Sequence, residues 1–263
     1  RRSSDLPKPA SVPEPPFWGR RVQKEINLDS VYSLLSEELL FKIRWGYKKG
    51  RLSDNEYREL LENRIRPEFQ KLKDLCASGG IFRPQAVYGY YPCKKRGDSL
   101  AVYSENRERE IAVLSFPRQK KSPGLCLADY FSDTWDCLAL QAVTLGSGAS
   151  RETARLYGEN RYKEYLLLHG LSVETTEALA EHITGIIRKD LGFPPPYLGK
   201  KALGKRYSFG YPPCPDLEGN RIILNILDAR EIGIDITETG QMVPEQTTCA
   251  FFIHHPQAEY FIL

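Results

Sequence analysis

The hydrophobic residues in the first part of the chain follow a helical period. This period is clear between residues 28 and 44, where it predicts a helix. A capping box formed by Ser53 and Glu56 begins a second helical pattern, which runs from residue 54 toward residue 76. Pro67 lies inside that pattern. Because proline lacks a backbone N–H, we expect it to kink or split the second helix.

The pattern then changes to that of β-strands. Short runs rich in β-branched and aromatic residues, bounded by turn residues, predict four strands. Gly97 lies in a hairpin turn between the first two of them. The predicted strands cover residues 85–93, 98–104, 110–117 and 137–146.

The second half of the chain begins with a helical stretch over residues 149–191. We expect an interruption at His169-Gly170 and an end at the proline-rich residues 192–197. A further helical piece is predicted near 221–231. Short strands are predicted at 234–239, 247–256 and 259–263. Strands and helices cluster instead of alternating strictly, which favours an α+β fold over a doubly wound sheet.

Composition and charge narrow the class of protein. The 263 residues carry a net charge of +3, which gives no support to nucleic-acid binding. The basic clusters at 94–96 and 118–121 lie in turn-like contexts and are interpreted as solvated loops. No apolar run is long enough to span a membrane. The six cysteines form no CxxC pair, so we expect reduced thiols in a cytoplasmic protein and no thiolate zinc site.

Residues 1–16 contain five prolines and few large apolar residues, which predicts an extended linker before a domain at 17–263. The chain has no starting methionine. We therefore expect it to be a segment of a longer protein or a processed product.

Several catalytic and metal-binding patterns are absent from the sequence. It has no P-loop, no GxSxG and no HExxH. Gly146-Ser147-Gly148 is interpreted as a strand-to-helix turn rather than a dinucleotide loop. His254 and His255 are adjacent near a strand end and point to opposite faces, so a structural role is favoured over a shared metal. We expect no catalytic residue and no metal ligand in this chain.

One stretch, KRYSFGYPPCPD at 205–216, combines groups suited to a ligand. Arg206 offers a planar fork for a carboxylate, and Gly210 permits close approach of the backbone. Tyr211 offers an aromatic face to a cation or sulfonium. The carbonyl groups of 211–213 can accept from an adenine amine. S-adenosylmethionine has all of these groups, although a proline-rich surface turn with an incidental arginine explains the same residues.

The sequence closely resembles the activation domain of cobalamin-dependent methionine synthase. The family signature RxxxGYP is present at 206–212, followed by Cys214-Pro215-Asp216. Other matching segments occur in order along nearly the whole chain after the linker. They are PPFWG (15–19), YGYYPC with GDSLAVY (88–103), LCLADYF (125–131), TEALAEHI (176–183), TETGQMVPEQTTCAFFIHHP (237–256) and EYF (259–261).

The resemblance implies a helmet-like α+β domain with a twisted antiparallel sheet and flanking helices. It implies a module of a methyltransferase that binds S-adenosylmethionine and presents the methyl group for reductive methylation of cob(II)alamin. Cobalamin would reach this chain only through the cobalamin-binding domain. Flavodoxin or a flavoprotein reductase would donate the electron. Neither nucleic acid nor a membrane is an expected partner.

The resemblance also implies a set of S-adenosylmethionine-binding residues. Asp29 and Glu177 match acidic residues of the family and are candidates for the ligand's ammonium group or ribose hydroxyls. Two departures from the family are Pro213, where alanine is common, and Lys200, where an acidic residue is common. The implied binding residues are Asp29, Glu177, Arg206, Gly210, Tyr211, Pro213 and Tyr260.

Two other functions remain open at this point. The chain could be a stand-alone S-adenosylmethionine-binding module that serves another corrinoid protein or acts as a sensor. Alternatively, it could be a structural interaction domain whose ligand site has decayed. Lys200, at a position where an acidic residue is common, suggests this alternative.

Overall fold

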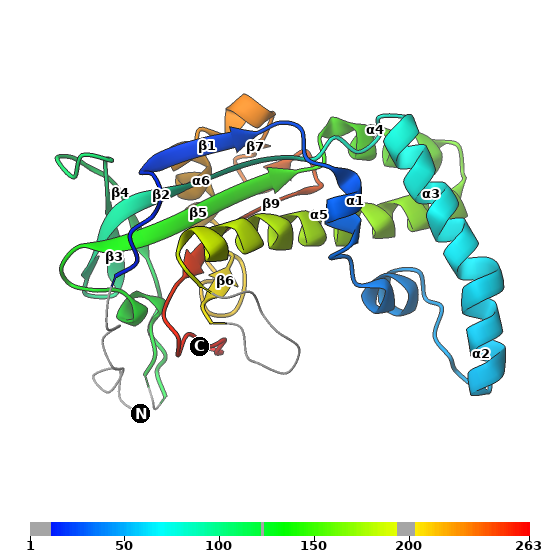
Figure 1. Ribbon diagram of the computed structural model, residues 1–263, viewed down its shortest axis with the longest axis horizontal. Coiled ribbons are helices and arrows are strands. Elements are labelled where there is room, and N and C mark those ends of the chain that lie inside the picture. Colours follow the sequence, from blue (N-terminus) through cyan, green and yellow to red (C-terminus); the bar gives the residue numbers. More distant parts are fainter. Residues whose placement is uncertain (1–11, 122–123, 194–202) are drawn as a thin grey trace.

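The computed structural model describes residues 12–121, 124–193 and 203–263. It has a mostly antiparallel sheet with helices on both faces (Figure 1), which confirms the expected α+β class. Residues 1–11 of the expected linker, and Lys200, lie outside the described residues, and the linker at 1–16 stays a prediction.

The main sheet has seven strands in the order β4-β3-β2-β5-β9-β6, and β1 pairs with β2 beside this path. Every pairing in it is antiparallel. The four strands predicted in the first half of the chain correspond to β2, β3, β4 and β5. The strands are β1 Gly19–Gln23, β2 Gln85–Arg96, β3 Ser99–Tyr103, β4 Glu110–Ser115, β5 Asp136–Thr144, β6 Lys205–Tyr207 and β9 Thr247–Ile253.

The central strand β5 explains why its sequence is a continuous apolar run. All nine of its residues are buried, since both faces of the sheet are covered. Leu138 and Leu140 point into one hydrophobic core, and Cys137 and Ala139 point into the other. Helix α6 (Glu218–Ile226) packs into the first core through Ile223. The long helix α5 belongs to the second.

Helix α5 (Tyr162–Asp190) spans 29 residues along one face of the sheet (Figure 1). The predicted interruption at His169-Gly170 is wrong, because α5 runs through it and the break falls before residue 162, after α4 (Ser147–Gly158). Gly170 serves packing instead. A Cβ at that position would lie 2.9 Å from Cβ of Arg44 and 3.0 Å from Cδ1 of Trp45. The glycine therefore lets Arg44 and Trp45 approach α5 closely.

The helix predicted over 28–44 is two short helices, α1 (Leu28–Tyr32) and the π-helix η2 (Leu39–Arg44). The capping box of Ser53 and Glu56 is confirmed at the start of α2 (Asp54–Leu60). The helical run is not split at Pro67: a π-helical turn, η3 (Leu61–Ile65), leads directly into α3 (Arg66–Ser78), and the proline occupies the first turn of α3. Helices α2 and α3 form an arm at one end of the molecule (Figure 1).

Other parts of the second half differ from the sequence prediction. Residues 259–263 form no strand. The strand expected at 234–239 is only β7 (Asp235–Ile236), which pairs with β8 (Met242–Val243) in a separate ribbon. The short 3-10 helices η4 (Leu127–Tyr130) and η5 (Ala229–Ile232) complete the fold. Strands β1 and β6 were not predicted, because each gains its partner only from the tertiary fold.

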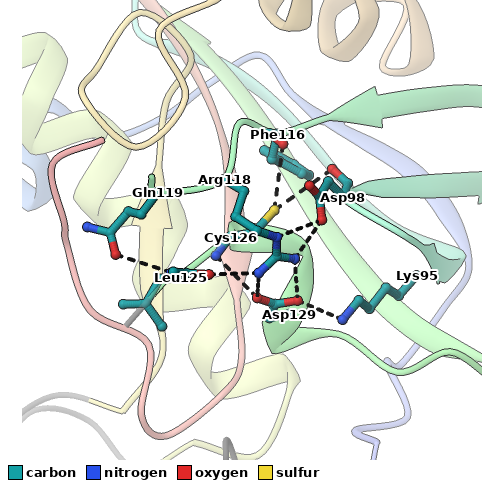
Figure 2. Close-up of polar contacts among 9 residues, drawn as sticks. Lys95, Asp98, Phe116, Arg118, Gln119, Leu125, Cys126 and Asp129 are labelled. Atoms are coloured by element: carbon teal, nitrogen blue, oxygen red, sulfur yellow. Dashed lines mark hydrogen bonds and ion pairs between the residues drawn. The ribbon is translucent and has the colours of Figure 1, made fainter. Parts of the chain in front are cut away.

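The basic cluster at 118–121 is not simply a solvated loop. Arg118 lies between Asp98 and Asp129, and Figure 2 shows its guanidinium bonded to both carboxylates. Asp129 is only 1% exposed and also accepts a hydrogen bond from Lys95, at 2.7 Å. Burial opposes ionisation of Asp129, but the bonds from Arg118 and Lys95 outweigh it and hold its pKa below the ordinary value. This cluster fixes the loop after β4.

The cysteines and His254 are buried in the fold. All six cysteines are buried and free. His254 is buried and its Nε2 lies 2.7 Å from Oδ1 of the equally buried Asp136. In the part of the chain that the structure describes, no group of His, Cys, Asp and Glu side chains could hold a metal. The helices of the same ranges include none with the length and apolar character needed to cross a bilayer.

Candidate ligand-binding groove

The RxxxGYP stretch begins on the edge strand β6 and ends in a tight turn. Arg206 pairs with Phe252 of β9, and the side chain of Tyr207 points into the core. Gly210 has a φ of +96°, a conformation that glycine adopts at little cost. The Cys214 N–H then donates to the Tyr211 carbonyl at 2.9 Å. The Tyr211 carbonyl therefore uses one of its two lone pairs within the turn and can accept one further hydrogen bond.

Glu177 of α5 lies opposite Arg206. Nη2 of the arginine is 2.9 Å from Oε2 of the glutamate, and the two side chains are 21% and 45% exposed. This is the only hydrogen bond from the Arg206 side chain to another described residue. A guanidinium carries five N–H donors, so most of its donor capacity remains available to a ligand.

Tyr260 lies beside Arg206 and Tyr207. Its hydroxyl donates to the backbone carbonyl of Arg206, while its ring packs against Tyr207 with centroids 4.8 Å apart. Desolvation of the hydroxyl raises the pKa of Tyr260 above its ordinary value, which keeps the phenol protonated as a donor. The rest of the side chain is exposed.

These residues line a cavity of about 240 Å³ at the edge of the sheet. It is formed by Glu177, Arg206, Tyr207, Ser208, Tyr211 and Tyr260. Tyr211 is 58% and Tyr260 60% exposed. Both tyrosines therefore lie at the mouth of the cavity, and the arrangement is an open groove instead of a closed pocket.

A second cavity of about 280 Å³ adjoins the first and shares Glu177, Ser208 and Tyr211 with it. Its walls come from α5, the RxxxGYP turn, α6 and the start of β9. The remaining lining residues are His169, Val173, Thr176, Phe209, Asn220, Met242, Glu245, Gln246, Thr247, Thr248 and Cys249. Because the two cavities share these three wall residues, we call them together the ligand groove.

Four of the seven expected binding residues meet in this groove or line it directly: Glu177, Arg206, Tyr211 and Tyr260. Gly210 shapes the turn but lines neither cavity. Pro213 is buried and lines neither cavity either. Asp29 is exposed in the first turn of α1 and is not among the residues of either cavity wall.

Two residues that the sequence did not single out support the motif. Asn220 is buried, and its Nδ2 lies 3.4 Å from the carbonyl of Phe209. Gly219 leaves room for the Phe209 ring, since a Cβ there would be 2.4 Å from three ring atoms. The sequence indicated these two residues only weakly, as a small and a polar residue at the start of the helix after the motif.

The ligand groove holds no activated nucleophile. Cys249 lines the second cavity, but burial raises the pKa of its thiol to about 12. Burial likewise raises the pKa of Cys214 to about 12. Both thiols are protonated near neutral pH, so the described part of the groove offers no thiolate.

These features define an α+β domain whose edge strand carries an open groove with an arginine and a glutamate facing each other. The family model for the activation domain of vitamin B12 dependent methionine synthase matches residues 37–263. The chain belongs to this family, as the resemblance in its motifs implied.

Known relatives agree with this assignment. The methionine synthase of Mycobacterium tuberculosis is 34% identical over 287 residues, which cover 98% of this chain and 24% of that protein. The methionine synthase of Mycobacterium leprae is 34% identical over 275 residues, with 95% and 23% covered. The chain thus spans about a quarter of the length of these relatives.

A solved structure of similar fold is a crystal structure of the MetH reactivation domain bound to AdoHcy. It matches with a TM-score of 0.78 and 21% identity, covering 99% of this chain and 84% of that chain. At this identity the likeness establishes the fold alone.

Proposed function

We propose that this domain binds S-adenosylmethionine in the ligand groove and presents its methyl group for reductive methylation of cob(II)alamin, as a module of a cobalamin-dependent methionine synthase. The observation that carries the proposal is Arg206. Its guanidinium lines an open cavity and, within the described chain, donates only one hydrogen bond, to Glu177. A free planar fork is suited to the ligand's carboxylate.

The shape of the groove supports an extended ligand. Pockets for ligands of drug size have volumes of about 300–1,000 Å³. The cavities of about 240 and 280 Å³ each fall below that range, but they share three wall residues, so an extended ligand would occupy both. With the carboxylate on Arg206, the adenosyl part would extend past Tyr211 into the second cavity. Asp29 and Pro213 would contribute only through movement on binding.

The exposed mouth supports transfer to a partner. The domain supplies a bound methyl donor, and the cobalt of the cobalamin-binding domain would receive the methyl group once a donor such as flavodoxin or a flavoprotein reductase supplies one electron. Tyr211 and Tyr260 leave the groove open on the side where a flat corrin would approach. Family membership and the AdoHcy-bound structure of similar fold both support this use of the groove.

Isothermal calorimetry with S-adenosylmethionine tests the proposal. The unmodified protein should bind it. The substitution Arg206→Ala should weaken binding about tenfold to a hundredfold through loss of a charge-assisted pair. Arg230→Ala is a matched control, because Arg230 is an arginine that is 79% exposed and lines no wall of the ligand groove. Equal affinity of the Arg206→Ala variant and the control would refute the proposed role of Arg206.

The proposal also requires that the domain alone leaves the ligand intact. Methyl transfer needs an attacking atom, and both buried thiols near the groove are protonated. Mass spectrometry after long incubation without corrinoid should therefore show unreacted ligand and unmodified protein. Conversion beyond that of a protein-free sample would show that cobalt is not needed.

A further inference from the structure

One wall of the ligand groove is made by the C-terminal segment, which we define as residues 256–263. This segment follows β9 and belongs to no strand or helix. It nevertheless carries Tyr260, whose hydroxyl bonds to the backbone of Arg206. A segment without ladder hydrogen bonds depends on individual contacts for its order. Those contacts therefore decide how firmly Tyr260 is placed.

Two side chains from other parts of the fold donate to carbonyl groups of the C-terminal segment. The hydroxyl of Tyr207 lies 2.8 Å from the carbonyl oxygen of Glu259. Nε2 of Gln119 lies 2.6 Å from the carbonyl oxygen of Ile262. These carbonyls flank Tyr260 on both sides. Tyr207 belongs to the RxxxGYP motif, but Gln119 lies in the loop after β4 and lines neither cavity.

Gln119 is itself held by contacts with Leu125. Oε1 of Gln119 accepts a hydrogen bond from the backbone N–H of Leu125 at 3.2 Å. The backbone N–H of Gln119 donates to the Leu125 carbonyl at 2.9 Å. The preceding residue, Arg118, is bonded to the buried Asp129 (Figure 2). Because Gln119 is held by Leu125, its amide can position the C-terminal segment.

We infer that Gln119 is a positioning residue for the ligand groove. Its amide holds the C-terminal segment so that Tyr260 stays against Arg206 and the wall of the first cavity is formed before the ligand arrives. Binding then avoids the cost of ordering that segment. This inference rests on the proposed function, because it concerns affinity for the same ligand.

Gln119→Glu separates the two roles of this side chain. A glutamate keeps an oxygen for the Leu125 N–H but replaces the amide donor with a carboxylate beside the Ile262 carbonyl. Loss of one hydrogen bond should weaken S-adenosylmethionine binding about threefold to tenfold in calorimetry. Amide hydrogen exchange over 258–263 should become faster in the ligand-free variant.

Gln70→Glu is the matched control. Gln70 lies on α3 and also spends its Nε2 on a single exposed acceptor, Oδ1 of Asp74, at 2.8 Å. It lines neither cavity. The change in charge and the lost donor are the same, so Gln70→Glu should leave both ligand affinity and exchange over 258–263 unchanged.

A double-mutant cycle shows whether Gln119 acts through Tyr260. In a Tyr260→Ala background the wall is already lost, so Gln119→Glu should have little further effect on affinity. A full additional loss in that background would overturn the inference, since a general disturbance of the fold would produce it.

The failure of this inference differs from failure of the proposed function. Undetectable binding of S-adenosylmethionine by the unmodified protein would overturn the proposed function and, with it, this inference. Normal binding by the unmodified protein together with unchanged affinity of Gln119→Glu would overturn this inference alone.

Discussion

Two arginine–carboxylate pairs of this domain, Arg118 with Asp129 and Arg206 with Glu177, differ in how far their hydrogen-bonding capacity is used. Arg118 donates from all three guanidinium nitrogens, to Asp98, Gly124 and Asp129. Asp129 is 1% exposed, whereas Glu177 is 45% exposed. Within the described residues, Arg206 makes one side-chain hydrogen bond.

The difference separates a structural arginine from one suited to a ligand. A guanidinium whose donors are all used beside a buried carboxylate cannot be removed without leaving that carboxylate short of partners, and it has no donor left for a ligand. A partly used guanidinium in an open groove contributes little to stability but keeps directional donors free. Sequence context pointed to Arg206 through its motif, but assigned Arg118 to a solvated loop.

The largest expected effect is on the stability of the fold, when the Arg118 side chain is removed. Arg118→Ala leaves the buried Asp129 with Lys95 as its remaining charged partner. The free energy of unfolding should fall by about 3 kcal/mol, the order seen when one partner of a buried pair is removed. Urea denaturation followed by circular dichroism measures this. A loss as small as that of an exposed pair would show that the cluster is not structural.

The next effect should appear in binding and not in stability. Arg206→Lys keeps the charge but loses the planar fork, so affinity for S-adenosylmethionine should fall while the urea midpoint stays near that of the unmodified protein. The loss should be smaller than the about tenfold to hundredfold loss expected for Arg206→Ala. If the lysine variant binds as well as the unmodified protein, charge alone and not the fork holds the carboxylate.

A smaller effect concerns the acid side of the stability profile. The pKa of Asp129 is lowered in the folded state, so its carboxylate stabilises the fold above the ordinary value of about 4 and loses this contribution as the pH falls below it. Asp129→Asn should therefore lose less stability than the unmodified protein between about pH 5 and pH 3. Urea midpoints across this range measure the difference. Parallel profiles would contradict the lowered pKa.

The smallest effect is expected for the exposed pair. Glu177→Gln should change the free energy of unfolding by at most about 1 kcal/mol, because exposed ion pairs contribute little. Thermal unfolding without ligand gives this value, and Glu181→Gln, on the same helix and 43% exposed, is a comparable control. A loss comparable to that of Arg118→Ala would remove the contrast between the two pairs.

The sequence alone determined much of this protein. Local rules predicted the capping box at Ser53 and the strand-to-helix turn at Gly146, since each depends on neighbours within a few residues. The apolar run of β5 and the RxxxGYP residues also carried enough information to predict a buried strand and a family, and the family is confirmed.

Only the tertiary structure decided the features that join distant parts of the chain. Strand β6 exists because β9 supplies its partner, and residues 259–263 are held by side chains where a strand was expected. Helix α5 runs through Gly170, and the absence of a side chain there leaves room for Trp45. Asp29 and Pro213, expected at the site, lie outside the groove walls. A periodic pattern reports which face of an element is buried, but not which distant side chain completes its hydrogen bonds.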